Sequence, residues 1–298
     1  MTVQAFERAV VRPLQEDDVG AAQELAWQSL HDASEQYGFA MGPNDAASIA
    51  RGRSRIRHLA GTDPSGTVVA ELDDELVGVG LGLRRGGLWF LSLLAVQSGL
   101  QGAGIGRRLL DATLEHGKDC PTAMICASPD PKALRRYGRA GFALHAGYSA
   151  SGIADRSELP AGLGIRDGDW ERDTELVEQL ITERRGEPYG PDLNWMREQG
   201  ARLLVRDGPQ PGDRAIALSR GGHVTAVIGA SSVAAARVLW AVVTEAEEEV
   251  GLGYLTGNQQ WAIDVALAAR LSLKLSDTVC TRGLATPPTP YLPSGLFG

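Results

Sequence analysis

The chain has 298 residues, of which 43% are hydrophobic, and a formal net charge of −8. The acidic balance argues against nucleic acid as a partner, because nucleic-acid binding requires a broad basic surface. No apolar run reaches the roughly 20 residues of a membrane span, and the N-terminus lacks the pattern of a secretory signal. The three cysteines and five histidines show no metal-ligand spacing, so we predict a cytoplasmic protein with reduced thiols and no metal.

The first half of the sequence predicts a mixture of strands and helices. Apolar residues at helical spacing after an acidic start predict a long first helix, and two β-rich runs around Asp73-Asp74 predict a hairpin. The run GLWFLSLLAV is almost continuously apolar, which is typical of a central strand buried on both faces. We expect strands at 10–13, within 66–84 as a hairpin, at 87–96 and at 122–128, and helices at 16–38, 44–60 and 130–142.

The second half echoes the first. The stretch GIRDGDWERDTELVEQLITER repeats the order of VVRPLQEDDVGAAQELAWQSL, namely a short strand, an arginine, an acidic start and an amphipathic helix. Such a repeat implies two copies of one domain, and we assign the domains to residues 1–150 and 151–298. In the second copy we expect a hairpin over 213–233, a buried strand at 236–243, a last helix over 258–273 and an extended strap or edge strand in the proline-rich tail.

A glycine-rich turn in LSLLAVQSGLQGAGIGRRLLDATL joins the predicted central strand to a helix. Backbone N–H groups of such a turn, together with the N-terminus of the following helix, favour a bound phosphate. The turn has no lysine, which excludes a P-loop, and Leu109 stands where a dinucleotide fingerprint needs its third glycine, which makes that interpretation weak. A tight turn that binds no ligand is the simpler alternative.

The turn resembles the acetyl-CoA loop of the GNAT N-acetyltransferases, whose signature is [RQ]-x-x-G-x-[GA] after a strand. Gln101, Gly104 and Gly106 match the fixed positions, and Val96 ends the strand. The resemblance implies that a backbone N–H at the strand end holds the thioester oxygen. The cofactor-binding residues that it implies are Leu94, Ala95, Val96, Gln101, Gly102, Ala103, Gly104, Ile105, Gly106 and Arg107.

A second landmark of this family is a helix that reads N-x-x-A-x-x-x-Y-x-x-x-G-F. Residues 130–142 match it, with Asp130 in place of asparagine and Tyr137 at the tyrosine position. The resemblance implies a cofactor contact for Asp130 and a catalytic role for Tyr137 as the acid that protonates the departing thiolate. A phenol with a pKa near 10 is protonated at neutral pH and suits that role. An ordinary core residue is the alternative for Tyr137.

The strand lacks the glutamate that often serves as the base in this family, and Ser92 is the only polar residue in WFLSLLAV. Glu35, Asp73 and Glu75 are candidate bases, although each is more simply explained as a solvated surface acid. The general base stays unassigned.

The second copy is expected to have lost acetyl-CoA binding. Aligning Arg12 with Arg166 and Gly141 with Ser272 puts the acidic run Glu245–Glu249 where the first copy has its glycine turn, and carboxylates there would repel a pyrophosphate. Val265 or Ala266 falls at the position of the tyrosine. We expect this copy to pack against the first and to shape the acceptor cleft.

The expected fold class is α/β, in an α+β layered arrangement of two GNAT-like domains, each with a mixed, mostly antiparallel sheet flanked by helices. The resemblance implies direct transfer of an acetyl group from acetyl-CoA to a primary amine, either a small molecule or an amino-terminal group, by a monomer or homodimer. The missing strand glutamate leaves a non-catalytic acyl-CoA-binding sensor as the alternative.

Overall fold

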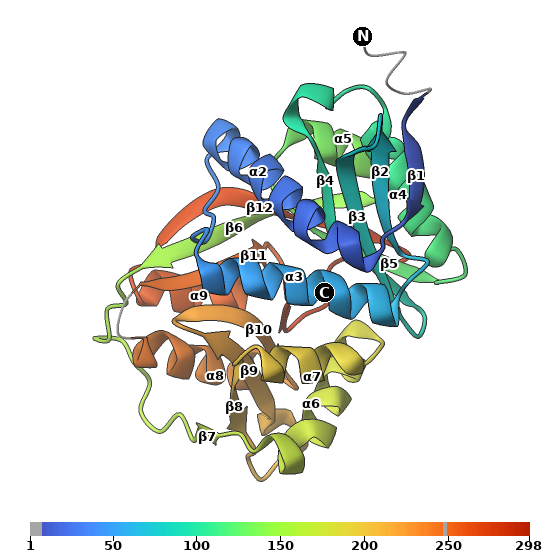
Figure 1. Ribbon diagram of the computed structural model, residues 1–298. Coiled ribbons are helices and arrows are strands. Elements are labelled where there is room, and N and C mark those ends of the chain that lie inside the picture. Colours follow the sequence, from blue (N-terminus) through green and yellow to red (C-terminus); the bar gives the residue numbers. More distant parts are fainter. Residues whose placement is uncertain (1–7, 247–248) are drawn as a thin grey trace. The chain divides into compact units, whose positions relative to one another are not determined.

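The computed structural model describes residues 8–246 and 249–298. The chain forms two compact units: unit 1 holds the described residues up to Phe142 together with Leu296–Gly298, and unit 2 is Ala143–Gly295 (Figure 1). The boundary expected at 150/151 falls inside strand β6, Ala143–Gly152, which lies entirely in unit 2. Within the described ranges, no helix is long and apolar enough to span a bilayer, and no three potential ligand side chains gather as a metal site.

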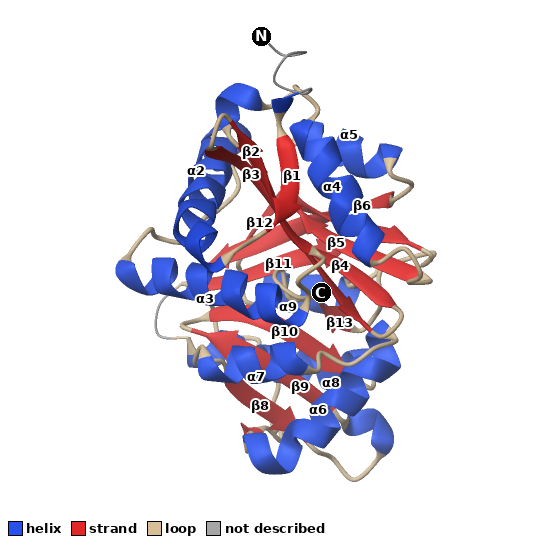
Figure 2. Ribbon diagram, turned by 45° about the vertical axis from the view of Figure 1, so that its right-hand side comes forward, coloured by secondary structure: helices blue, strands red, loops and turns tan. Residues whose placement is uncertain are grey.

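Unit 1 is built on the sheet β1-β2-β3-β4-β5, in which only β5 runs parallel to its neighbour β4. Helices α2 and α3 lie on one face of this sheet, and α4 and α5 lie on the other (Figure 2). A mixed, mostly antiparallel sheet flanked by helices confirms the expected fold class. The elements are β1 Val10–Pro13, α2 Val19–Tyr37, α3 Ala46–Thr62, β2 Thr67–Leu72, β3 Glu75–Arg85, β4 Leu88–Val96, α4 Ile105–His116, β5 Thr122–Ala127 and α5 Pro131–Arg139.

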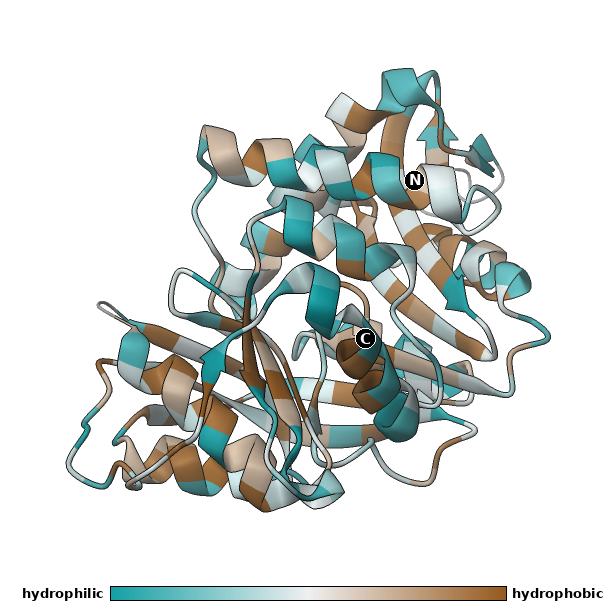
Figure 3. Cartoon of the chain, turned by 90° about the horizontal axis from the view of Figure 1, so that it is seen from below, coloured by the Kyte–Doolittle hydropathy of each residue, from teal (hydrophilic) through white to brown (hydrophobic). Residues whose placement is uncertain are grey.

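The local signals of the sequence act as expected in unit 1. Asp73 and Asp74 both adopt left-handed backbone angles, with φ of 55° and 65°, and form the turn between β2 and β3. Trp89 of the apolar strand β4 is fully buried, and its indole N–H donates to the carbonyl of Thr113 in α4 at 2.8 Å. Hydrophobic residues concentrate on the strands and on the helix faces that cover them (Figure 3), so β4 is the centre of this core.

The last residues of the chain belong to unit 1. The ring of Phe297 packs edge-on against His58 of α3, with ring centroids 5.9 Å apart. Gly298 lies against Phe90 of β4, so closely that a Cβ on the glycine would stand 2.8 Å from the phenyl ring. Unit 1 is therefore assembled from two widely separated parts of the sequence.

From β7 to β12, the elements of unit 2 follow the same order as those from β1 to β6. In this comparison β12 of unit 2 corresponds to β6. Its sheet has the order β12-β6-β11-β10-β9-β8-β7, and the additional strand β13 pairs with β10. Arg166 binds Asp173 at the start of α6 as Arg12 binds Asp18 before α2. The elements are β7 Arg166–Asp167, α6 Trp170–Arg185, α7 Pro191–Glu198, β8 Arg202–Arg206, β9 Ala215–Arg220, β10 His223–Gly229, α8 Ser232–Glu245, β11 Val250–Thr256, α9 Gln260–Ala268, β12 Ser272–Arg282 and β13 Tyr291–Leu292.

The prediction of a buried strand at 236–243 is wrong, because these residues lie inside helix α8. Ser231 caps the helix by accepting a hydrogen bond from the N–H of Ala234 at 3.2 Å. The helix is buried around most of its circumference, so its apolar residues form no stripe, and a continuous apolar run does not distinguish a buried helix from a buried strand. The strand that corresponds to β4 is therefore β10.

The predicted last helix is also shorter than expected: α9 ends at Ala268, and β12 begins at Ser272. The residue that corresponds to Gly141 is Arg270, not Ser272. Gly141 and Arg270 both have positive φ, 86° and 55° respectively. The following N–H groups bond back in the same way, from Phe142 to the carbonyl of Tyr137 and from Leu271 to that of Ala266. Ala266 therefore occupies the position of the tyrosine.

The acidic run does not replace the glycine turn, which corrects the alignment above. Glu245 is the last residue of α8 and β11 follows, so the run lies in the connection that corresponds to α4–β5. Glu247 and Glu248 lie outside the described residues. The true counterpart of the turn is the connection from β10 to α8, which consists only of residues 230–231, whereas residues 97–104 connect β4 to α4. Unit 2 lacks the turn because its connection is short.

Candidate active site

The glycine turn adopts a conformation that requires glycine at two positions. Gly102 and Gly104 have φ of 89° and 88°, in the left-handed region that other residues rarely adopt. Gly104 is the N-cap of α4, and its carbonyl accepts from the N–H groups of Arg107 and Arg108 at 3.0 and 3.2 Å. The turn thus delivers the chain directly into the N-terminus of α4, where unpaired N–H groups favour an anion.

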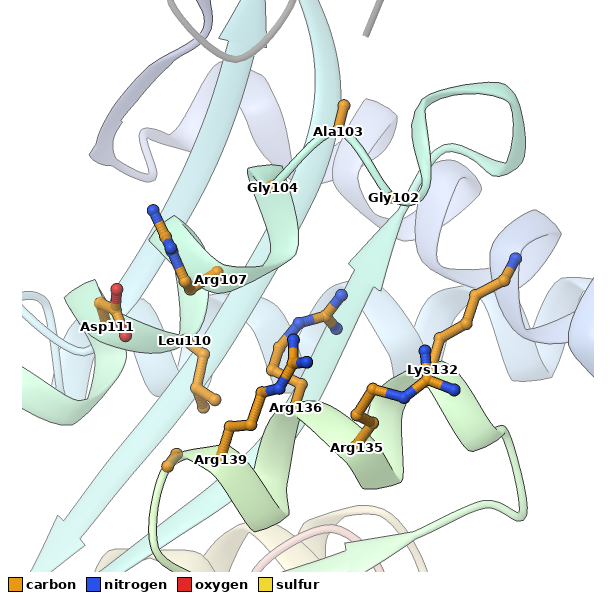
Figure 4. Close-up of a pocket in the computed structure, with 11 residues that line it drawn as sticks. Gly102, Ala103, Gly104, Arg107, Leu110, Asp111, Lys132, Arg135, Arg136 and Arg139 are labelled. Atoms are coloured by element: carbon orange, nitrogen blue, oxygen red, sulfur yellow. The ribbon is translucent and has the colours of Figure 1, made fainter. Parts of the chain in front are cut away.

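A cavity of about 630 Å³ lies between this turn, the first turns of α4 and helix α5 (Figure 4). Figure 4 shows the long basic side chains of α5 extending from one wall towards the glycine turn and α4 on the other. Such a concentration of positive charge beside a helix N-terminus favours a ligand with several phosphate groups. The lining residues are Gly102, Ala103, Gly104, Arg107, Leu110, Asp111, Lys132, Arg135, Arg136, Arg139 and Ala140.

Three of the arginines in this wall have no partner in the part of the chain that the structure describes. Neither a hydrogen bond nor an ion pair holds the guanidinium of Arg135, Arg136 or Arg139. Arg136 lies against α4, since a Cβ at Gly106 would stand 2.8 Å from its Cζ. Gly106 therefore lets a guanidinium approach the first turn of α4. Like charges close together on one helix destabilise it slightly, and a bound polyanion would offset this cost.

Gln101 connects the turn to its surroundings. Its Nε2 donates to the carbonyl of Val96 at 3.3 Å, and its Oε1 accepts from Nζ of Lys132 in α5 at 3.1 Å. The same Val96 carbonyl also accepts from Oγ of Ser29 in α2 at 3.0 Å. The end of β4 is therefore held by side chains from the turn and from α2, and Lys132 is linked to the turn.

The C-terminal part of β4 has one edge without a strand partner among the described residues. The pairing with β5 ends at Leu91↔Ile125, although β4 continues to Val96. On the other edge, β3 pairs with β4 throughout, with a bulge that leaves Ser92 unmatched between Leu91 and Leu93. We call residues 92–96 the open edge of β4. The sequence-predicted residues Leu94, Ala95 and Val96 lie on this stretch, and the backbone groups that point away from β3 face no neighbouring strand.

No carboxylate stands on the open edge. Glu35, Asp73 and Glu75 are all exposed, Asp73 forms an ion pair with Arg8, and Glu35 lies 3.6 Å from His31. Ser92 has a buried Oγ without a hydrogen-bond partner in the described structure, which is costly unless a ligand or water satisfies it.

Tyr137 lies on α5, the helix that carries the basic wall, and its side chain is 5% exposed. It is not among the residues that line the cavity. Asp130 is the N-cap of α5 and accepts from the N–H of Lys132 at 2.8 Å. Burial raises the pKa of Tyr37, at the end of α2, and the charge of nearby Asp130 raises it further.

The structure thus brings the predicted turn residues Gly102, Ala103, Gly104 and Arg107 into one cavity, with Gln101, Ile105 and Gly106 beside it. Sequence reasoning missed the second wall. Lys132, Arg135, Arg136 and Arg139 stand out as a basic run, KALRRYGR, but only the fold shows that this helix faces the turn.

Comparisons with known proteins agree with this geometry. Residues 24–142 match the model of the acetyltransferase (GNAT) family. A mycothiol acetyltransferase from Streptomyces avermitilis is 32% identical over 127 residues, which cover 41% of this chain and 40% of that protein. The match therefore spans less than half the length of this curated relative.

Two crystal structures share the fold along nearly the whole chain. A protein from Pyrococcus horikoshii, provisionally named an acetyltransferase, is similar with a TM-score of 0.76 and 17% identity, over 98% of this chain and 96% of that one. A GCN5-related N-acetyltransferase from Sphaerobacter thermophilus has a TM-score of 0.57 and 17% identity, over 93% and 96%. We conclude that residues 24–142 match the acetyltransferase (GNAT) family, and that this match covers less than half of the chain.

Proposed function

We propose that unit 1 binds acetyl-CoA and transfers its acetyl group directly to a primary amine, on a small molecule or an amino terminus. The observation that carries the proposal is the cavity in which a left-handed glycine turn and a helix N-terminus face unpaired arginines of α5. A diphosphate with a further phosphate, as in CoA, matches the charge of both walls. The match of residues 24–142 to the GNAT family model supports the same acyl donor.

The open edge of β4 ends where the connection that carries the glycine turn begins, and it offers backbone groups to an extended ligand arm. We place the pantetheine arm along this edge, so that an N–H of Leu94, Ala95 or Val96 donates to the thioester oxygen. Such a donor stabilises the oxyanion that forms when the amine attacks. Tyr137 would then protonate the departing thiolate, because a phenol is protonated at neutral pH.

The open edge carries no carboxylate, so the proton of the attacking amine leaves through water rather than directly to a strand glutamate. We therefore expect the rate to rise with pH until the acceptor amine is deprotonated. A small-molecule amine acceptor, a cytoplasmic location and a monomeric or homodimeric state are part of the same proposal.

The alternative is an acyl-CoA sensor that binds the thioester without turnover, and the absence of a strand carboxylate favours it. Thiol release from acetyl-CoA across a panel of amines separates the two. Wild type should release thiol with at least one amine, and Tyr137→Phe should lower kcat by roughly 10²-fold or more while CoA affinity changes little. Tyr148→Phe, in unit 2, is the matched control. Tight binding of acetyl-CoA without turnover on any amine would establish the sensor.

A further inference from the structure

Strand β10 of unit 2 is the counterpart of β4. As in β4, its pairing with the parallel neighbouring strand, here β11, covers only part of one edge. Along its first edge, β10 pairs with β9 from His223 to Gly229. Along its second edge, the parallel pairing with β11 is limited to His223↔Gly251. The rest of that edge corresponds to the open edge of β4.

In unit 2 this edge is occupied by the chain's own tail. Strand β13 pairs antiparallel with β10 at Val227↔Leu292 and Ile228↔Tyr291. Because β9 takes the first edge of β10, β13 lies on the edge that β11 leaves, and it also contacts β11. Leu292 is 2% exposed, so the tail is packed into the sheet and is not merely laid over it.

Side chains at the start of α9 hold the tail at its other edge. Oε1 of Gln259 accepts from the N–H of Tyr291 at 3.3 Å, and its Nε2 donates to the carbonyl of Pro288. Nδ2 of Asn258 donates to the carbonyl of Pro287 at 2.6 Å. Gln259 is the N-cap of α9, as Asp130 is the N-cap of α5. Gln259, which binds the tail in unit 2, therefore corresponds to Asp130 in unit 1, for which the family resemblance implies a cofactor contact.

We propose that residues 287–294 are a built-in strand ligand, which fills in unit 2 the place that the acyl-CoA arm takes in unit 1. The comparison of the two places rests on the function proposed for unit 1. The chemistry of the occupant is that of an extended peptide, which satisfies a strand edge through backbone hydrogen bonds and fills side-chain pockets. The chain therefore has one acyl-CoA site, and its second site of this type is a peptide groove that is occupied in cis.

This assignment explains how unit 2 tolerates the loss of its phosphate turn. A strand edge without a partner is a liability, because it pairs with other chains. In unit 1 the edge is kept for a ligand that the glycine turn captures. In unit 2 the short connection at 230–231 offers no such turn, and the tail closes the edge permanently.

The seating of the tail is tested by cysteine trapping in the full chain. Register partners on antiparallel strands have Cα atoms about 4.5–5.5 Å apart, which suits a disulfide. The double variant Val227→Cys/Leu292→Cys should form this cross-link under mild oxidation, as identified by peptide mass spectrometry. The control Val227→Cys/Thr286→Cys carries its second cysteine at an exposed tail position and should not. Equal cross-linking of the two pairs, or none at 227–292, would overturn the assignment.

Hydrogen exchange in the full chain gives an independent measurement. Leu292→Asp puts a charge into the buried groove and should speed exchange of peptides covering 287–294 and 223–229 by more than about tenfold. Thr286→Asp adds the same charge at an exposed position and should leave both segments protected. The same protection in both variants would refute a groove that depends on Leu292.

Calorimetry with acetyl-CoA separates this inference from the function on which it rests. Wild type should bind one molecule per chain. Two molecules per chain would contradict a filled second site, whatever the cross-linking shows. No binding at all would refute the proposed function of unit 1, and with it the comparison of the two places.

Discussion

Replacing Gly104 tests whether the backbone conformation of the turn determines the affinity of the cavity for CoA. Gly104 has a φ of 88° and is the residue from which α4 starts. An L-residue with a Cβ pays about 1–2 kcal/mol in the left-handed region. If the free turn relaxes to avoid this strain, Gly104→Ala must restore the shape on binding, and its affinity for CoA should fall roughly 5- to 30-fold.

Isothermal calorimetry with CoA measures this loss directly. Gly99→Ala is the matched control, because Gly99 lies in the same connection, is exposed, has no positive φ and has open space around the position of a Cβ. Gly104→Glu adds a carboxylate to the cavity wall and should abolish measurable binding. If Gly104→Ala bound CoA as tightly as Gly99→Ala, the reasoning from backbone conformation would be refuted.

Three further outcomes follow from the structure of unit 1. Arg135→Ala with Arg139→Ala should weaken CoA binding by roughly tenfold or more and flatten its dependence on salt concentration, because unpaired guanidinium groups bind phosphates; an unchanged salt slope in calorimetry would contradict this. Ser92→Ala removes a buried hydroxyl without a partner and should raise the free energy of unfolding by up to about 1 kcal/mol in denaturant titrations, and a large loss of stability would show that the hydroxyl is satisfied. Burial opposes ionisation of Asp63, but the hydrogen bond from His116, the charge of Arg85 and further hydrogen bonds lower the pKa of Asp63 to about 2. Its folded pKa lies below the unfolded value, so this stabilisation of about 2 kcal/mol is present above pH 4 and is lost as the pH falls from about 4 to 2; Asp63→Asn should remove that acid-dependent part of the unfolding curve.

The elements that could be predicted from the sequence are those whose signals are local. Gly102 and Gly104 mark the turn because glycine adopts their backbone angles without strain, and Asp73-Asp74 forms the expected hairpin turn. The match at Tyr137 likewise depends on spacing within one helix. Each of these features is written in a short window of residues, and the structure places each on the expected element.

The features that could not be predicted depend on what surrounds a segment. Helix α8 is apolar on most sides because it is buried, and burial is not visible in a run of residues without a polar stripe. A strand expected at 236–243 puts the acidic run directly after it, at the position of the glycine turn, whereas the run in fact follows a helix. The approach of Arg136 to Gly106 at the start of α4, and the pairing of Leu292 with β10, bring together segments that are distant in sequence.

The contact between Phe297 and His58 has a consequence for the order of folding. It joins residues at opposite ends of the sequence within one unit, with the whole of unit 2 encoded between them. During synthesis the N-terminal segments emerge first, yet this packing against α3 forms only after unit 2 and Phe297 have left the ribosome. The unit that carries the glycine turn is therefore the first to begin folding and the last to be finished, and contacts of such long range are slow to form.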